Sequence, residues 1–459
     1  MKLRLRPLLL AVLVAAALLG GAAPAHADGP TTLTGTLPDG ATWKAEVPSP
    51  WNGTLILYNH GYVPPIPGIQ NPAIDVSDPF TGGYLLSQGY ALAGSSYASI
   101  GWAVADALRD QLAVLDVFAQ QVGKPKATYT WGDSLGGMIT AGLVQVAPRR
   151  FTGALPMCGV LAGGVGIWNQ GLDGAYALKT LLAPDSPLQL VHITDPGGNL
   201  NLAEQGLAAA QATPQGRARI ALAAALADIP GWFDPATPEP ARNDVATQEE
   251  NQFRFFQQQG IPFEFAFRAE LEARAGGNPS WNTGVNYAEQ LRRSADRHEV
   301  EALYRQAGLR LSADLAALNK APRVSADAPA VRYLTRFITY DGDLSRVPVL
   351  TIHTTGDTLV VPENERAYAS VVARAGDSGL LREAFVHRAG HCTMTPAERI
   401  AALQALFDRV RTGRWDGLAS AAALNARAAA LPSSLQLAPP SYVPFQPAPF
   451  LRPFDRRSG

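Results

Sequence analysis

A short segment at residues 131–137, Trp-Gly-Asp-Ser-Leu-Gly-Gly, limits the folds open to this chain more than any other part of the sequence. It follows a β-branched and aromatic run at 127–131, typical of a buried strand, and precedes an apolar stretch at 135–146, typical of a packed helix. Glycines on both sides of Ser134 let the backbone turn sharply between the two. A Gly-x-Ser-x-Gly core can arise by chance, but between a strand and a helix it indicates a turn that exposes the serine hydroxyl for nucleophilic attack.

Predicted strands and helices alternate on both sides of this segment. The stretches 31–37 and 42–47 alternate polar and apolar residues around a Pro-Asp-Gly turn, which predicts an antiparallel hairpin. Further strands are expected at 54–58, 90–95, 127–131 and 152–157, with helices at 102–122 and 135–146. This alternation predicts an α/β fold with a mostly parallel central sheet and helices on both faces.

The alternation stops after residue 158 and resumes near residue 341. The stretch between is alanine-rich and helical in pattern, with clusters of tryptophan and phenylalanine, so we interpret it as an inserted helical cap domain. Strands are then expected at 347–353 and 381–386, and helices at 363–373 and 396–411. The predicted organisation is a signal peptide at 1–27, core segments at 28–158 and 341–412, a cap or lid at 159–340, and a C-terminal helix and proline-rich tail at 413–459. We expect the tail to be an extended strap over the surface or partly disordered.

The first residues have the pattern of a secretory signal peptide. Lys2, Arg4 and Arg6 precede an apolar run at 8–19, and an Ala-His-Ala sequence ends at residue 27. The apolar run is too short for a comfortable membrane span, so the mature protein is expected to be secreted, without stable membrane insertion. A net charge of −1 disfavours nucleic acid and anionic membranes as partners, and the oligomeric state is left open.

No cluster of histidine, cysteine, aspartate or glutamate has the spacing of metal ligands, and no glycine-rich loop is suited to a phosphate or a dinucleotide. The sequence therefore predicts chemistry without a metal or another cofactor.

A serine nucleophile needs a base to accept its proton and a carboxylate to orient that base. In a parallel sheet such groups follow the carboxyl ends of strands. Asp357 follows the expected strand at 347–353, and His391 follows the one at 381–386. Asp341 and Asp343 are rivals for the acid, but they precede their strand and would lie at its wrong end. His387 is the rival for the base, but it directly ends its strand, whereas His391 stands further into the loop. We therefore expect Asp357 to be the acid and His391 the base.

Over about residues 40–160 and 345–412 the chain resembles the α/β-hydrolase superfamily, above all its large secreted bacterial serine hydrolases with an esterase-like or lipase-like character. The resemblance implies the order nucleophile, acid, base, which Ser134, Asp357 and His391 follow. It also implies an oxyanion hole made by the backbone N–H groups of Leu135 and of Tyr62, with Gly61 as the second choice for the latter donor.

In this interpretation His60 braces the loop that carries Tyr62 and transfers no proton. Asp133, beside the nucleophile, is pointed away by the turn and is expected to be structural. Cys158 and Cys392 both fall at the carboxyl edge of the sheet. A disulfide between them would tie the start of the cap to the histidine loop, and two buried free thiols are the alternative.

The expected mechanism is acyl transfer to water through an acyl-enzyme on Ser134. The aromatic clusters of the cap suggest an apolar pocket, which favours carboxylic esters, either small or polymeric, as substrates. A peptidase or amidase with the same triad is the alternative. An exopeptidase would have to bind a free amine, and the cap holds acids that could do so. These acids are Asp234, Glu239, Glu249 and Glu250. A non-catalytic binding protein on the same fold is less favoured, because no residue of the triad is missing.

Overall fold

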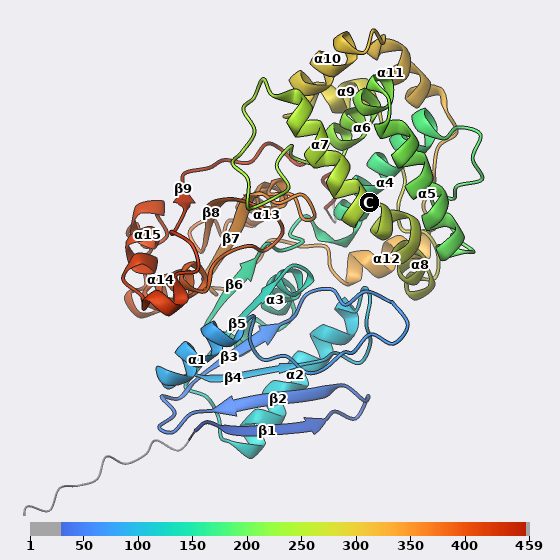
Figure 1. Ribbon diagram of the computed structural model, residues 1–459. Helices are drawn as coiled ribbons and strands as arrows, with labels where there is room; N and C mark the ends of the chain where they lie inside the picture. The colour runs from blue at the N-terminus through green and yellow to red at the C-terminus, as the bar shows by residue number, and fades with distance from the viewer. Residues whose placement is uncertain (1–28, 456–459) are drawn as a thin grey trace, which may run out of the picture.

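The computed structural model describes residues 29–455, so the predicted signal peptide at 1–27 lies outside the described residues. In this part of the chain nine strands form one sheet in the order β1-β2-β4-β3-β5-β6-β7-β8-β9 (Figure 1). Strands β4, β3, β5, β6, β7 and β8 pair in parallel, whereas β1 and β2 on one edge and β9 on the other pair antiparallel. The strands are β1 (Thr31–Thr36), β2 (Thr42–Val47), β3 (Thr54–Asn59), β4 (Ala91–Ser95), β5 (Ala127–Asp133), β6 (Gly153–Met157), β7 (Val349–Gly356), β8 (Leu381–Ala389) and β9 (Tyr442–Val443).

The two faces of the sheet carry separate apolar cores, because side chains alternate along a strand. On β3, Leu55 and Leu57 pack into one core, and Ile56 and Tyr58 pack into the other. The first face is covered by α2 (Val104–Gln121), α3 (Leu135–Val146) and α13 (Glu363–Ala375), and the second by α1 (Pro79–Ser87) and α14 (Pro396–Thr412). Helices on both faces of a mostly parallel sheet confirm the predicted fold class, and the architecture is that of an α/β hydrolase.

The chain between β6 and β7 forms a helical cap with its own core (Figure 1). Helix α6 (Pro214–Leu226) lies at its centre, and residues 220–226 of this helix are completely buried. A helix that is apolar all round is stable only when other helices enclose it. The helices that pack on it are α4 (Gly163–Leu182), α5 (Pro196–Gln211), α7 (Val245–Phe255), α9 (Tyr287–Arg293) and α10 (Arg297–Gln306). The cap also contains α8 (Arg268–Ala275), α11 (Leu311–Lys320) and α12 (Ala328–Arg336).

Helix α1 was not expected, since its sequence, Pro-Phe-Thr-Gly-Gly-Tyr-Leu-Leu-Ser, contains two glycines that weaken the helical pattern. Its start is stabilised by Asp78, whose side chain accepts a hydrogen bond from the Thr81 N–H.

Strands β7 and β8 run three residues further than expected, to Gly356 and Ala389.

Over the described residues the proline-rich tail is extended, as expected of a surface strap, and a few of its side chains anchor it in the protein. After α15 (Ala421–Ala429) it adds β9 to the sheet, and the side chains of Phe450 and Leu451 are buried. Phe450 packs in the cap core, and the Arg452 guanidinium lies 2.6 Å from the buried carboxylate of Asp173 on α4. These anchors were not expected, because the partners of Phe450 and Arg452 lie far away in the sequence. None of the described helices is both long and apolar enough to span a bilayer.

Candidate active site

Ser134 lies at the sharp turn between β5 and α3, with φ 61° and ψ −124°. A positive φ is strained for any residue other than glycine, and such strain is common at active sites. Glycine is needed on either side because the neighbouring backbone is so close. A Cβ on Gly132 would lie 2.4 Å from the Asn59 carbonyl oxygen, and one on Gly136 would lie 1.9 Å from it. The motif thus presents the serine at the carboxyl end of the sheet.

Asn59, at the end of β3, holds this turn from behind. Its completely buried side chain donates hydrogen bonds to Thr130 Oγ1 at 2.9 Å, Thr140 Oγ1 at 2.7 Å and the Trp131 carbonyl oxygen at 3.0 Å. These contacts join β3, β5 and α3. Sequence reasoning missed Asn59, although a polar residue that ends an apolar strand is a signal.

Asp133 points away from the nucleophile side of the turn. One of its oxygens accepts a hydrogen bond from the Tyr58 hydroxyl at 2.8 Å, and the other lies 3.2 Å from the Arg399 guanidinium on α14. These buried contacts connect Asp133 to β3 and α14, as expected for a residue with a structural role.

The structure brings Asp357 and His391 together. Asp357 directly follows β7, and its Oδ2 accepts a hydrogen bond of 2.7 Å from His391 Nδ1. Its Oδ1 accepts hydrogen bonds of 3.0 Å from the backbone N–H groups of Leu359 and Val360. Although burial alone would raise the pKa of Asp357, His391 and His353 hold it well below its usual range. An ionised carboxylate in this place favours the His391 tautomer that carries its proton on Nδ1 and leaves Nε2, 3.4 Å from Cys392 Sγ, without one.

The rival residues lie elsewhere. Asp341 and Asp343 precede β7, at the opposite end from Asp357. His387 lies within β8, where its ring is 5.0 Å from that of Trp232 and its Nε2 is 3.7 Å from Glu239. Within residues 29–455 no hydrogen bond connects His387 to Ser134, Asp357 or His391.

A second histidine, His353 on β7, lies behind the acid and was not expected. Its completely buried ring donates from Nδ1 to Glu365 at 2.8 Å and from Nε2 to the Val360 carbonyl oxygen at 2.7 Å, and Nε2 is 3.4 Å from Asp357 Oδ2. Burial alone would lower the pKa of His353, but the two carboxylates raise it to about 10. The ring is therefore a cation at neutral pH, placed between Asp357 and Glu365.

A disulfide joins the nucleophile side of the site to the histidine loop. Cys158 and Cys392 are bonded, as expected in preference to two free thiols. The Ser134 N–H donates to the carbonyl of Met157, the residue before Cys158, at 2.9 Å, and Cys392 directly follows His391. Within the described residues no hydrogen bond joins Ser134 Oγ to the His391 ring, a contact that often tightens only when substrate binds. His391 and the two cysteines lie close enough together to be considered as metal ligands. Both cysteine sulfurs are bonded to each other in the disulfide, however, so neither can bind a metal as a thiolate.

The loop after β3 lies against the serine. A Cβ on Gly61 would be 3.4 Å from Ser134 Cβ, and the next residue, Tyr62, lines the pocket into which Ser134 opens. Over the described part of the chain, the backbone N–H groups of Tyr62 and Leu135 donate to no protein acceptor. His60 stacks on Tyr97 at 3.9 Å between ring centroids, and burial lowers its pKa, so it is neutral. Two backbone donors are thus free beside the nucleophile.

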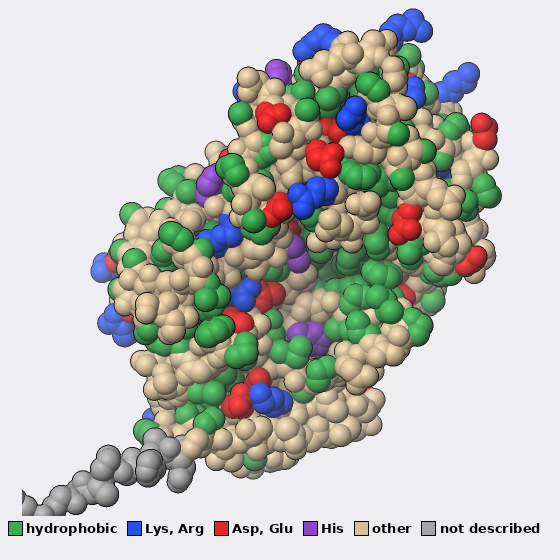
Figure 2. All heavy atoms as spheres, viewed as in Figure 1, with side chains coloured by type: hydrophobic (Ala, Val, Ile, Leu, Met, Phe, Trp, Pro, Cys, Tyr) green, Lys and Arg blue, Asp and Glu red, His purple; other side chains and the backbone are tan. Residues whose placement is uncertain are grey.

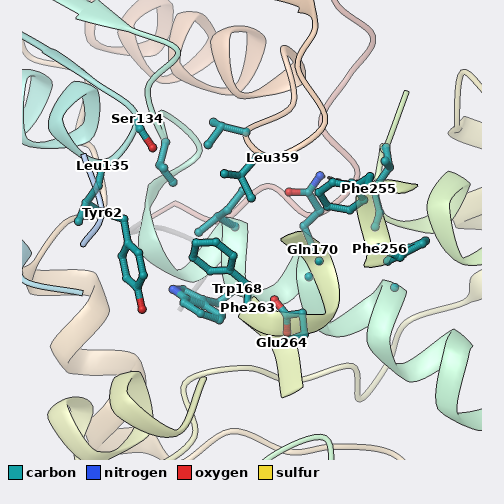
Figure 3. Close-up of a pocket in the computed structure, with 18 of the residues that line it drawn as sticks. Tyr62, Ser134, Leu135, Trp168, Gln170, Phe255, Phe256, Phe263, Glu264 and Leu359 are labelled. Carbon is teal, nitrogen blue, oxygen red and sulfur yellow. Dashed lines mark hydrogen bonds between the residues drawn. The ribbon is translucent and has the colours of Figure 1, made fainter. Parts of the chain in front are cut away.

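The pocket beside Ser134 lies between the sheet domain and the cap. Figure 2 shows hydrophobic side chains gathered in a hollow between these two parts. Figure 3 shows the Ser134 hydroxyl at one side of the pocket, facing aromatic side chains of the cap. The aromatic lining residues are Tyr62, Trp102, Trp168, Phe255, Phe256 and Phe263. A pocket with this lining suits a largely apolar ligand.

None of the four cap acids considered for binding an amine lines this pocket. Asp234 pairs with Arg254, and Glu239 lines a different cavity. Glu249 and Glu250 accept hydrogen bonds from Gln211. The acid that does line the pocket is Glu264, which sequence reasoning did not single out.

No family model matches the chain. Its sequence is 30% identical over 414 residues to an o-phthalyl amidase from Xanthobacter agilis, a match that covers 84% of this chain and 88% of the amidase. Among solved structures, an esterase and feruloyl esterase B, both from Aspergillus oryzae, are each 16% identical with a TM-score of 0.42. These two matches cover 84% of this chain and 79% and 81% of the respective esterase chains.

Proposed function

We propose that this chain, a hydrolase that belongs to the family of the o-phthalyl amidase from Xanthobacter agilis, releases aromatic acyl groups from amides and esters through a serine nucleophile. The observation that carries the proposal is Ser134, held in a strained turn at the edge of a pocket with aromatic lining. Its N–H bonds to Met157, and the next residue, Cys158, is disulfide-bonded to Cys392 beside the His391–Asp357 pair.

Each residue of the site takes one role in this reaction. His391 Nε2 accepts the Ser134 proton while Oγ attacks the substrate carbonyl carbon. The N–H groups of Leu135 and Tyr62 stabilise the oxyanion, and His391 returns the proton to the leaving nitrogen or oxygen. His391 then activates a water molecule that hydrolyses the acyl-enzyme. Asp357 keeps the imidazole oriented and stabilises its charged form.

Two arguments bear on whether the substrate bond is an ester or an amide, and the second has more weight. The apolar pocket led us to expect carboxylic esters. The relative is named for hydrolysis of an amide, which favours amides of aromatic acids, with esters of the same acids as easier substrates because their leaving group needs less protonation. An exopeptidase has less support, since the four acids expected to bind a free amine lie outside the pocket.

Three substrate classes test this proposal. The p-nitroanilide and the p-nitrophenyl ester of benzoic and phthalic acids share their acyl groups and differ only in the bond, and aminoacyl p-nitroanilides carry a free amine. We expect turnover of both aromatic series and none of the aminoacyl series. Turnover of aminoacyl anilides alone would instead support the exopeptidase.

A non-catalytic protein on this fold remains the rival of a different class. A fluorophosphonate probe labels an activated serine covalently, so we expect labelling of the wild type and none of Ser134→Ala. Equal labelling of both proteins would refute the assignment of Ser134.

We also propose that the protein is exported. The proposal rests on the basic and apolar pattern at residues 1–27, and the disulfide is consistent with an oxidising compartment. The N-terminal sequence of the mature protein from the culture medium tests it. We expect the mature protein to start at Asp28.

A further inference from the structure

Glu264 is the charged side chain in the pocket beside Ser134. Of the described residues that line this pocket, it alone is an aspartate, glutamate, lysine, arginine or histidine; burial raises the pKa of its carboxyl group, and Arg268 opposes that shift. It lies on a π-helical segment, η3 (Phe263–Phe267), and another, η2 (Phe256–Gly260), precedes it in the chain. Such segments are rare and frequently occur at functional sites. Figure 3 shows Glu264 across the pocket from Ser134, beyond the ring of Phe263.

One oxygen of this carboxylate is held by the protein. Arg268, one helical turn later and completely buried, donates from Nη2 to Glu264 Oε2. The same guanidinium donates to Ser280 Oγ at 3.1 Å and to the Trp168 carbonyl oxygen at 3.3 Å, and it lies 5.0 Å from the centroid of the Trp168 ring. These contacts fix the carboxylate in position and neutralise its charge.

The other oxygen is left for a ligand. Among residues 29–455 no donor binds Glu264 Oε1, yet this atom is not sealed inside the protein. It approaches α4 where Gly171 leaves space, since a Cβ on Gly171 would lie 1.9 Å from it. An anionic oxygen without a donor is costly in an apolar pocket. A substrate that brings a donor to Oε1 therefore gains more than one that covers it with a methyl group.

We propose that Glu264 Oε1 is a specificity site that accepts a hydrogen bond from a neutral hydroxyl group on the aromatic acyl group of the substrate. The proposal rests on the proposed function, because it assigns the acyl group to this pocket. A neutral donor fits better than a cation, since Arg268 already neutralises the carboxylate and apolar side chains form most of the remaining wall. The site does not take part in the bond change at Ser134 and selects the substrate only by its distal substituent.

The first test uses the wild-type enzyme and p-nitrophenyl benzoates that carry a hydroxyl, methyl or aminomethyl group at the meta or para position. Hydroxyl and methyl groups have similar size. A hydrogen bond to a charged acceptor predicts a kcat/KM about 10- to 150-fold higher for the hydroxyl compound at the position that reaches Oε1. Equal values for hydroxyl and methyl at both positions would overturn the proposal. A preference for the positively charged aminomethyl compound would also overturn it, because the donor would then be a cation.

The second test removes the charged acceptor. Glu264→Gln is expected to reduce the hydroxyl-over-methyl ratio to less than about threefold, with the change mainly in the hydroxyl substrate. Glu270→Gln is the matched control, because Glu270 also pairs with an arginine four residues later, Arg274, but does not line the pocket. It should keep the wild-type ratio. A ratio unchanged in Glu264→Gln would overturn the assignment, and if this variant does not fold, the wild-type comparison decides alone.

Failure of the proposed function can be told apart from failure of the Glu264 proposal. If no benzoate ester is hydrolysed, the proposed function is wrong, and calorimetric binding of p-cresol and p-xylene to the intact protein then tests Glu264 directly. Tighter binding of p-cresol that is lost in Glu264→Gln supports the site. Equal binding of the two compounds refutes it.

Discussion

Replacement of His353 by glutamine tests how much the positive charge of this ring, which lies beside Asp357, contributes to stability and activity. In the wild type the ring donates hydrogen bonds to Glu365 and to the Val360 carbonyl oxygen, and it lies beside Asp357. Glutamine retains much of the volume and one donor group but carries no charge. The variant therefore leaves Glu365 buried without its cation, and it leaves His391 as the one histidine beside Asp357.

The size of the effect follows from the pKa of His353. Its folded value of about 10 lies above the ordinary 6.5, so the stabilisation is complete below pH 6.5 and is lost as the pH rises through 10. At 1.36 kcal/mol per pKa unit, this difference corresponds to about 5 kcal/mol. The lowered pKa of Asp357 arises partly from the same contact with His353, so its contribution to the unfolding free energy is not counted a second time. Since glutamine recovers one hydrogen bond, we expect a loss of about 3 to 5 kcal/mol at pH 6.

Urea unfolding of the wild type and His353→Gln between pH 6 and pH 10 measures this loss. The difference in unfolding free energy should be largest at pH 6 and should shrink towards pH 10. At 25 °C and pH 7 the folded variant should also lose about ten- to a hundredfold in kcat with little change in KM, because Asp357 orients the base less well and His353 does not line the pocket.

His387→Gln is the matched control, since this histidine is on the adjacent strand β8 but is about half exposed. We expect it to change neither stability nor kcat appreciably. A destabilisation by His353→Gln that is the same at every pH would refute the reasoning, because it would show a packing effect with no contribution from charge.

Three further predictions concern the nucleophile, the disulfide and the tail. Ser134→Ala should lower kcat by at least about 10⁴-fold with an unchanged urea midpoint, and a loss of folding would show that the serine is structural instead. Replacing both Cys158 and Cys392 by serine opens a loop with a sequence separation of 234, so unfolding should become easier by about 5 kcal/mol, and an unchanged melting temperature would contradict this. Arg452→Met leaves the Asp173 carboxylate buried without its cation, which should cost about 3 kcal/mol or more in the same unfolding assay. A loss below 1 kcal/mol would show that Asp173 is neutral in the folded protein.

Local patterns predicted the parts of the site that depend on one strand and the turn after it. Ser134 was recognisable because glycines flank it between a strand and a helix. Asp357 and His391 were chosen because each follows a strand of a parallel sheet, and the structure places their side chains 2.7 Å apart. The same logic placed Cys158 and Cys392 at one edge of the sheet, where they are bonded.

The missed residues depend on contacts between distant segments. His353 lies in an apolar strand and gave no sign that two carboxylates would surround it. Glu264 and Arg268 have the spacing of an ordinary surface ion pair on a helix, and only the packing of the cap buries the arginine and leaves one carboxylate oxygen open to the pocket. Asn59 was missed because its partners on β5 and α3 lie more than 70 residues away.

The contact between Asp173 and Arg452 also sets an order of events during synthesis. The carboxylate is made 279 residues before its partner, and no other described arginine or lysine forms an ion pair with it. A nascent chain that already contains every cap helix therefore still has a buried acid without its counter-ion. The cap can reach its final packing only after residue 452 has left the ribosome exit tunnel, so we expect this lobe to complete its folding later than its own helices are synthesised.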